Sequence, residues 1–324
     1  MYPVKLIPAV KDYLWGGQQM KELYGFEGGE ILAEAWMLSC NPAGESLIAE
    51  GPLAGKSLRE VLFAEAEGAL GKKTPMSVYF PLLIKFIDAK QALSIQVHPD
   101  DAYAIANEGG FGKTEMWYIL DAAEDSFLYC GFEKQVDKDE LRARIKDNTV
   151  TEVLRRVSVK KGDTLFIPAG TVHAIGAGIL IAEVQQNSNS TYRVYDFGRV
   201  GPDGKERELH IDKALDVIRP EFGQDGISHP QDIAIAGGKS ARLAECQYFT
   251  VDRVTVDSAV HMECGEDSFD SLLFVEGKGR ILFLDAKDVD DGELSVKTGD
   301  SVFVPAGSGR YVVEGDCCFL LSRV

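Results

Sequence analysis

One twelve-residue pattern occurs twice in this chain of 324 residues, and it constrains the fold more than any other feature. The first copy covers residues 162–173 and the second covers residues 299–310. Each copy has a Gly-Asp turn, a short apolar strand and a Pro-Ala-Gly corner in the same register. Two copies of one turn-strand-turn unit predict two domains of the same kind, each a small antiparallel β-barrel. The alternative is that the string is only a common turn followed by a strand.

The length and periodicity of the chain agree with a division into two domains. A chain of 324 residues is longer than one hydrophobic core usually serves. We expect a first domain over residues 1–225, with helical insertions at about 57–70 and 137–157, and a second domain over residues 240–324. The segment 223–238 is rich in Gly, Asp, Ser and Pro and is the expected linker. The C-terminal half has a hydrophobic period of two with frequent turn signals, which is typical of antiparallel strands.

Capping patterns place the two inserted helices. Ser57 is followed three residues later by Glu60, and Asp137 is followed by Glu140, as at many helix N-termini. A set of apolar residues at helical spacing predicts that the second helix continues to residue 157; these residues are Val150, Val153, Leu154 and Val157.

Charge and composition exclude several classes of partner. The formal net charge is −17, which argues against nucleic acid and anionic membranes, because both need a positive footprint. No run approaches the roughly 18 apolar residues of a membrane span, and the N-terminus lacks the pattern of a signal peptide. The six cysteines show no framework spacing, so we expect reduced thiols in a cytoplasmic protein. An anionic substrate would need nearby Lys and Arg side chains to overcome the negative field.

The last residue of the repeated pattern differs between the two copies. It is His173 in the first copy and Arg310 in the second. The Gly-Asp…Pro-x-Gly-x-x-His pattern resembles the second sequence motif of the cupin superfamily, in which the final histidine is a metal ligand. The resemblance implies a mainly β fold of two jelly-roll barrels with a few short helices in the N-terminal half. It also implies a metal site in the first barrel and a degenerate second barrel without one.

A second histidine stands on a short predicted strand. Alternate residues of a strand point to the same face, so Gln96 and His98 project together while Ile95 and Val97 face apolar packing. Pro99 then ends the strand, because proline cannot donate to the ladder. An amide oxygen and an imidazole nitrogen on one face could supply half of a metal site.

Glu115 and His173 complete a set of four candidate ligands with Gln96 and His98. Two imidazoles, one carboxylate and one amide oxygen suit a catalytic Zn²⁺, or less selectively Mn²⁺, Fe²⁺, Co²⁺ or Ni²⁺. A cation held by a single negative charge would act as a Lewis acid. Taken singly, each residue has a plainer interpretation: a strand histidine is often structural, and Glu115 could pair with Lys113.

Several strings resemble those of type I phosphomannose isomerases, in particular of the compact bacterial branch. They lie at residues 94–99, 112–117 and 167–193, with shorter strings at 13–17 and 34–36. The resemblance covers most of residues 5–220. In that family the zinc ligands are a Gln, a His, a Glu and a later His; the matching residues here are Gln96, His98, Glu115 and His173. The resemblance thus implies one Zn²⁺ per chain in the catalytic domain, with other divalent metals as alternatives.

The resemblance also implies a reaction, the interconversion of mannose 6-phosphate and fructose 6-phosphate through a cis-enediol. It needs a metal to polarise the sugar oxygens, a base to move a proton between C2 and C1, and a basic group to hold the phosphate. Arg193 matches the active-site arginine of the family by its place after His173, although its flanking residues differ from those of longer members. A guanidinium suits bidentate binding of an oxyanion. Lys113 is a second cation, beside Glu115.

The identity of the base stays open between Glu183 and a metal-bound water. Glu183 follows His173 by ten residues, close to the place of the acidic residue of the family. A shift of one position in the strand would turn the Glu183 side chain to the other face.

Three further residues are candidates for substrate binding. Lys85 lies within an apolar run, and Arg199 follows Arg193; each can hold the phosphate or be an ordinary edge or surface charge. Trp15 stands beside two glycines and can line the pocket or be a buried structural aromatic.

Two other functions compete with the isomerase. The first is another metal-dependent cupin enzyme such as a dioxygenase, but Gln96 at a ligand position and the cations Lys113 and Arg193 argue against it. The second is a non-catalytic sugar-binding protein of two barrels, which the intact ligand set argues against. The sequence carries no indication of the oligomeric state.

Overall fold

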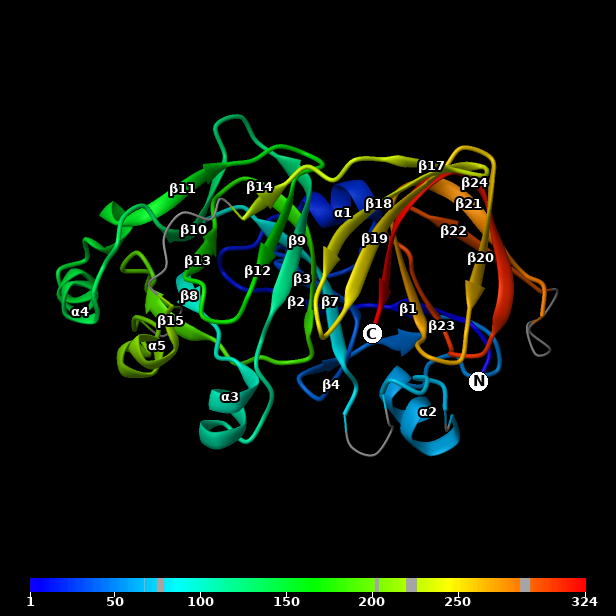
Figure 1. Cartoon of the computed structure of the whole chain (residues 1–324), viewed down its shortest axis with the longest axis horizontal. Helices are drawn as coiled ribbons and strands as arrows, with labels where there is room; N and C mark the ends of the chain where they lie inside the picture. Colours follow the sequence, from blue (N-terminus) through cyan, green and yellow to red (C-terminus); the bar gives the residue numbers. More distant parts are fainter. Residues whose placement is uncertain (67, 75–78, 202–203, 220–225, 286–291) are drawn as a thin grey trace. The chain divides into compact units, whose positions relative to one another are not determined.

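The computed structural model describes most of the chain (Figure 1). The described residues are 1–66, 68–74, 79–201, 204–219, 226–285 and 292–324. Strands make up most of the regular structure, and the strand pairs with a described register are antiparallel; the mainly β fold is therefore confirmed. No helix in the described part of the chain has the length and apolar character needed to cross a bilayer.

Five α-helices and one 3₁₀ helix occur among these residues. They are α1 (Gln19–Tyr24), α2 (Leu58–Glu65), α3 (Asp101–Asn107), α4 (Lys138–Lys146), η1 (Val150–Glu152) and α5 (Ile211–Val217). The strands of the N-terminal part are β1 (Val4–Ile7), β2 (Ala9–Lys11), β3 (Glu34–Leu38), β4 (Cys40–Asn41), β5 (Gly44–Glu45), β6 (Leu47–Ile48), β7 (Leu82–Ala89) and β8 (Ile95–Val97). The strands of the middle part are β9 (Glu115–Ala122), β10 (Phe127–Phe132), β11 (Leu154–Ser158), β12 (Thr164–Ile167), β13 (His173–Ile175), β14 (Ile179–Gln186), β15 (Tyr192–Tyr195) and β16 (Ile227–Ser228). The remaining strands are β17 (Ile233–Ile235), β18 (Gly238–Glu245), β19 (Thr250–Val256), β20 (Ala259–Cys264), β21 (Asp270–Phe283), β22 (Glu293–Lys297), β23 (Ser301–Val304) and β24 (Gly309–Arg323).

The chain forms two compact units. Unit 1 contains Met1–Val10, Ala35–Lys85 and Pro230–Val324, and unit 2 contains Lys11–Glu34 and Phe86–His229. The units thus do not follow the expected ranges of 1–225 and 240–324, because two N-terminal segments cluster with the C-terminal one. The division into one metal-bearing barrel and one degenerate barrel stays a prediction.

Unit 2 is built around a five-stranded sheet in the order β11-β10-β13-β8-β15. One hydrophobic cluster joins residues of this sheet to residues of the neighbouring strands β9, β12 and β14; among its members are Leu128, Ile175, Trp117, Leu165 and Ile181. A second cluster joins the sheet to α4 and α5, and it includes Ile95, Val97, Leu141, Ile145 and Leu215. The five-stranded sheet is therefore packed on both faces.

Local sequence signals explain two of the helices. The Ser57 hydroxyl accepts a hydrogen bond from the amide of Glu60 at the start of α2, as the capping pattern predicted. The Asp100 carboxylate caps α3 in the same way, by accepting from the amide of Tyr103. The helix predicted over 57–70 is shorter than expected: α2 ends at Glu65, and residue 67 lies outside the described residues.

The second predicted helix, 137–157, is wrong in its C-terminal half. α4 ends at Lys146, Asn148 adopts a left-handed φ of 57°, and Leu154–Ser158 is the strand β11. Residues three apart on a strand point to opposite faces. Leu154 packs in the cluster with α4 and α5, whereas Val157 packs in the other cluster. Leu154 and Val157 have the spacing of residues on one face of a helix, but they are buried on opposite faces of a strand.

Unit 1 contains a larger sheet in the order β17-β18-β19-β24-β21-β23-β1-β6, with β20 paired to β24 and β22 paired to β21. Its core consists mainly of Val, Leu, Ile, Phe and Tyr side chains such as Phe274, Tyr311 and Phe319. Its two longest strands, β21 and β24, have 14 and 15 residues and pair along most of their length. A register shift between Phe274 and Glu276 interrupts this pairing, and such irregularities let a long strand bend.

The repeated pattern has the same local structure in both units. Asp163 accepts a hydrogen bond from the amide of Lys160 at 2.9 Å, and Asp300 accepts one from the amide of Lys297 at 2.9 Å. Each turn leads into a four-residue strand, β12 or β23. The strand after the Pro-Ala-Gly corner is β13 in unit 2, and it begins at His173.

The segment expected to be a linker, 223–238, contains short strands. Residues 223–225 lie outside the described residues. In the remainder, β16 pairs with β12 and β17 pairs with β18. The composition rich in Gly and Pro therefore marks turns between edge strands.

Candidate metal centre

Three strands of unit 2 bring the four predicted ligands together. Gln96 lies on β8 and His98 directly follows it, Glu115 begins β9, and His173 begins β13 and pairs with Gln96 across the sheet. Ile95 and Val97 are fully buried in a hydrophobic cluster, which leaves the opposite face of β8 for the two polar side chains, as alternation predicts.

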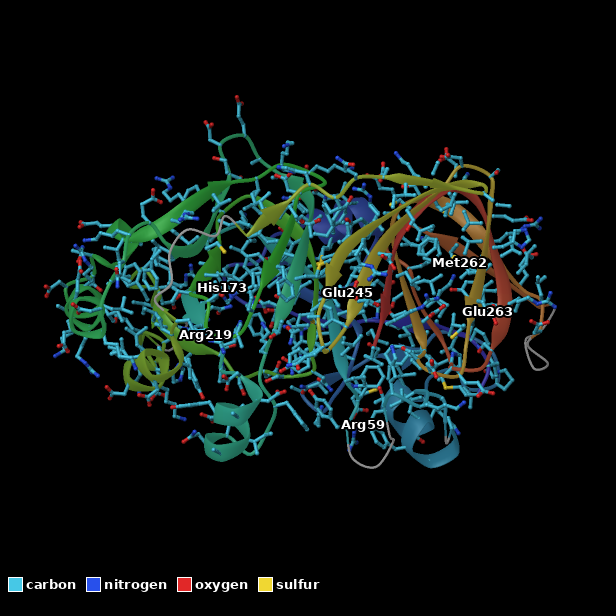
Figure 2. All side chains as sticks on the ribbon, in the orientation of Figure 1. Arg59, His173, Arg219, Glu245, Met262 and Glu263 are labelled. Atoms are coloured by element: carbon cyan, nitrogen blue, oxygen red, sulfur yellow. The ribbon has the colours of Figure 1, made fainter. Side chains whose placement is uncertain are left out.

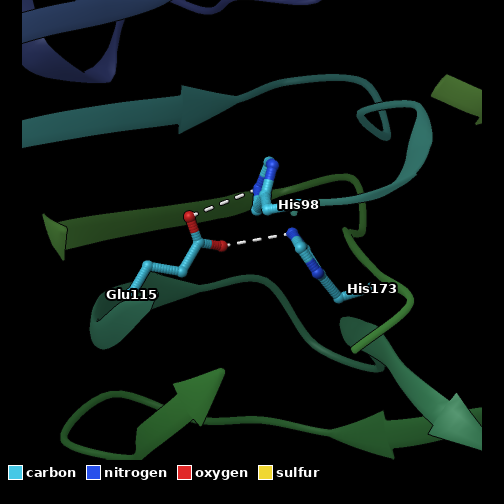
Figure 3. A group of neighbouring side chains, drawn as sticks. All are labelled: His98, Glu115 and His173. Carbon is cyan, nitrogen blue, oxygen red and sulfur yellow. Dashed lines mark ion pairs between the residues drawn. The ribbon is translucent and has the colours of Figure 1, made fainter. Parts of the chain in front are cut away.

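The ligand atoms of His98, Glu115 and His173 lie within 4.8 Å of one another (Figure 3). Oε1 of Glu115 is 3.1 Å from Nε2 of His173, and Oε2 is 3.5 Å from Nε2 of His98. All three side chains are almost fully buried, and His173 lies in the interior of unit 2 (Figure 2). Two imidazole nitrogens and one carboxylate therefore converge on one point away from water.

Backbone carbonyls fix the orientation of both imidazoles. Nδ1 of His98 donates to the carbonyl oxygen of Ser190, and Nδ1 of His173 donates to that of Thr171, each at 2.9 Å. A carbonyl can only accept, so the proton of each neutral ring is on Nδ1 and the lone pair is on Nε2. Metal-ligating histidines usually have such a partner on their other nitrogen. Burial, together with the charge of Lys113, also lowers the pKa of His98 well below its ordinary value, which keeps the ring neutral.

Glu115 is a buried carboxylate that needs compensating positive charge. Burial alone would raise the pKa of Glu115, but the neighbouring ammonium of Lys113 holds that pKa well below its ordinary value. Neither carboxylate oxygen accepts a hydrogen bond of standard geometry. An anionic carboxylate facing two imidazole lone pairs is a donor set that fits a divalent cation.

Gln96 stands next to this set. Its side-chain amide lies 3.5 Å from Nε2 of His173. Rotating the amide by 180° exchanges its nitrogen and oxygen in place, so an oxygen ligand is available at this position. The geometry thus brings Gln96 to the cluster, in the place that the strand pattern predicted.

Lys113 and Glu183 adjoin the three ligands. Nζ of Lys113 forms an ion pair with Oε2 of Glu115, and it lies 3.1 Å from Nε2 of His98 and 3.8 Å from Oε1 of Glu183. Glu183 is on β14, opposite Trp117 of β9, and its other oxygen accepts a hydrogen bond from the indole Nε1 at 2.8 Å. The register that the sequence left open therefore points Glu183 toward the cluster.

The two arginines lie in different surroundings. Arg193 pairs with Gln96 in the β8–β15 ladder, and its Nη1 donates to the carbonyl of Glu208 at 2.7 Å. Arg199 donates to the carbonyl of Ala92 and lies 3.6 Å from the carboxylate of Asp196. Arg193 is thus next to a ligand strand, while these partners of Arg199 are outside the ligand cluster.

Lys85 and Trp15 have packing contacts that account for their positions. Lys85 belongs to unit 1, is buried, and its Nζ lies 5.2 Å from the centre of the Trp36 ring. Trp15 is buried in the unit 2 cluster that also contains Trp117 and Ile119. Their predicted roles in substrate binding stay predictions.

Sequence reasoning missed the groups that orient these side chains. Thr171 and Ser190 act through backbone carbonyls, which no side-chain pattern reveals. Trp117 could have been found, because it follows Glu115 by two residues on a strand and therefore shares its face.

Comparisons with known proteins agree with this geometry. Residues 4–124 match the catalytic domain model of type I phosphomannose isomerase, and residues 239–324 match the cupin domain model of mannose-6-phosphate isomerase. A probable mannose-6-phosphate isomerase of Bacillus subtilis, GmuF, is 35% identical over 99% of this chain and 99% of its own length. The chain belongs to the type I phosphomannose isomerase family.

Other members of the phosphomannose isomerase family match over similar lengths. The mannose-6-phosphate isomerase of Streptococcus mutans is 35% identical and covers 99% of this chain and 98% of its own length. The crystal structure of the Bacillus subtilis mannose 6-phosphate isomerase superposes with a TM-score of 0.90, at 34% identity and over 100% of both chains. Membership of this family, together with the His/Glu/His group, favours the isomerase over the dioxygenase and the non-catalytic sugar-binding protein.

Proposed function

We propose that this protein interconverts mannose 6-phosphate and fructose 6-phosphate at the cluster formed by His98, Glu115 and His173. The single observation that carries the proposal is the convergence of these three buried side chains in a chain of the phosphomannose isomerase family. Aldose–ketose isomerisation moves a proton between C2 and C1 while the sugar oxygens gain negative charge. The site must therefore provide a positive centre, a base and an anchor for the phosphate.

His98, Glu115 and His173, with Gln96, would hold one divalent cation, and we propose Zn²⁺. Nitrogen and oxygen ligands without a thiolate suit a catalytic zinc ion. When bound, the cation supplies a Lewis acid that polarises the sugar oxygens. Because Nδ1 of each histidine donates to a carbonyl, the ring planes are fixed before a metal or a substrate arrives.

Glu183 is the proposed base. Its carboxylate is buried, and Oε1 lies 3.8 Å from Nζ of Lys113. A single carboxylate can take the C2 proton and return it to C1 when both carbons present the same face, as in a cis-enediol. The ammonium of the neighbouring lysine can neutralise negative charge that develops on a substrate oxygen.

Arg193 is the proposed anchor for the phosphate, and Lys113 and Arg199 are further candidates. The guanidinium of Arg193 retains a buried Nε without a hydrogen-bond partner, while its Nη1 is bound to a backbone carbonyl. In a chain with a net charge of −17, a phosphate needs such a local cation. Arg199 lies six residues further along, with Nη1 buried beside Asp196.

The proposed setting is cytoplasmic, with a sugar phosphate as the partner molecule. The six cysteines are free thiols, which supports a reducing compartment. The acidic net charge supports the absence of nucleic acid and anionic membrane surfaces among the partners.

The test is isomerase activity as a function of bound metal. The purified protein is dialysed against a chelator and assayed for conversion of mannose 6-phosphate to fructose 6-phosphate, before and after Zn²⁺ is added. We expect activity to vanish on dialysis and to return with zinc. Glu183→Gln should abolish turnover with the bound metal unchanged. A folded, zinc-loaded protein with no isomerase activity would refute the proposed reaction.

A further inference from the structure

Trp117 connects the proposed base to the core of unit 2. It is the third residue of β9, 1% exposed, and directly opposite Glu183 in the β9–β14 ladder. Its indole Nε1 donates to Oε2 of Glu183 at 2.8 Å. This hydrogen bond is buried, so water competes little for either partner.

The indole distinguishes the two oxygens of the Glu183 carboxylate. Oε2 accepts from Trp117, whereas Oε1 lies 3.8 Å from Nζ of Lys113. An indole N–H donates only and keeps its proton, so it cannot itself act as an acid or base here. Its effect on the carboxylate is therefore to hold one oxygen and to turn the other toward Lys113.

Packing prevents Trp117 from moving away from this position. Its ring meets the ring of His173 edge to face, with centroids 5.3 Å apart and planes at 75°. The ring is also part of the hydrophobic cluster that contains Ile119, Leu165 and Ile181. One rigid side chain thus touches both a proposed metal ligand and the proposed base.

We propose that Trp117 is a positioning residue of the isomerase, whose N–H holds the Glu183 carboxylate so that Oε1 faces the carbon atoms between which the proton moves. The inference rests on the proposed role of Glu183 as the base. A base displaced by a fraction of an ångström loses rate without losing substrate binding. The loss of Trp117 should therefore appear in kcat and leave KM nearly unchanged.

The first experiment compares Trp117→Phe with the control Ile119→Val. The phenylalanine keeps an aromatic ring but has no N–H, while Ile119→Val reduces packing in the same cluster and on the same strand. We expect Trp117→Phe to lower kcat by about 10- to 100-fold, the usual effect of removing a hydrogen bond that orients a site group. Bound zinc and KM should stay close to wild type, and Ile119→Val should keep its kcat.

A double-mutant cycle separates positioning from general damage. Glu183→Asp withdraws the carboxylate from the indole, so Trp117→Phe should cause little further loss of kcat in that background. Should Trp117→Phe fail to fold, Trp117→benzothienylalanine replaces the N–H by sulfur with almost the same shape, and the same loss of kcat is expected.

Each outcome decides a different claim. If Glu183→Gln retains activity, Glu183 is not the base, and the positioning role of Trp117 falls with it. An inactive, metal-loaded Glu183→Gln together with an undiminished kcat in Trp117→Phe overturns the positioning role and leaves the proposed reaction intact. Losses that multiply in the double variant also overturn it, because Trp117 would then act independently of Glu183. Loss of zinc from Trp117→Phe would also overturn the positioning role, because Trp117 would then support metal binding through its contact with His173.

Discussion

The balance of charge around Glu115 makes a quantitative prediction for Lys113→Met in the metal-free protein. The Glu115 carboxylate is fully buried, and the ammonium of Lys113, 5% exposed, is the cation paired with it. Methionine keeps the unbranched shape and the apolar packing of the lysine stem but removes the charged terminal group. Removing one partner of a buried ion pair lowers the free energy of unfolding by about 3–5 kcal/mol, because the other charge stays buried without compensation.

The measurement is the free energy of unfolding from urea melts, first with a chelator and then with saturating Zn²⁺. In the chelator, we expect the free energy of unfolding of Lys113→Met to be about 3–5 kcal/mol lower than that of wild type. Most of the deficit should disappear with zinc, because the bound cation then balances Glu115. For wild type, zinc at 100 times its Kd should add about 2.7 kcal/mol, and the variant should gain more.

A matched control separates this effect from the loss of any lysine. Lys134 forms an exposed ion pair with Glu140 at 2.9 Å, so Lys134→Met should leave the free energy of unfolding nearly unchanged and should not respond to zinc. Equal stability of Lys113→Met and wild type in the chelator would refute the reasoning. A deficit that zinc leaves unchanged would show that the metal does not bind beside Glu115.

Three further predictions concern the rest of the chain. Arg323→Met should lower the free energy of unfolding by about 3–5 kcal/mol in urea melts, because it leaves the fully buried carboxylate of Asp270 without its cation. The Arg310 guanidinium lowers the pKa of Asp285 to about 2. Arg310→Ala should return that pKa toward about 3.9 in an NMR titration. In wild type, the stabilisation by this pair is present above pH ~4 and should be lost as the pH falls to about 2. Ser57→Ala should cost about 1 kcal/mol in the same melts, because the cap of α2 is lost.

The cluster of His98, Glu115 and His173 could be predicted in part, because the positions of both histidines follow local rules. Strand alternation places Gln96 and His98 on one face, and the repeated turn places His173 at the start of a strand. The contact between His173 and Gln96 depends on the pairing of β13 with β8, which a single sequence does not reveal. It followed from the resemblance to a family.

Other parts of the structure depend on contacts that spacing alone cannot identify. Leu154 and Val157 are spaced as on a helix, but each packs on a different face of β11. The inward direction of Glu183 depends on its register with Trp117, which a shift of one residue would reverse. Arg199 contacts the backbone carbonyl of Ala92 and the carboxylate of Asp196. A contact with a backbone carbonyl cannot be predicted from the pattern of side chains.

The most direct test of the central claim is an anomalous diffraction experiment at the zinc edge on crystals of the active protein. We predict one anomalous peak per chain, bound by Nε2 of His98, Nε2 of His173 and the Glu115 carboxylate, with the Gln96 amide as the fourth group. Active crystals without a peak at this position, or with a zinc ion held only by other residues, would contradict the account.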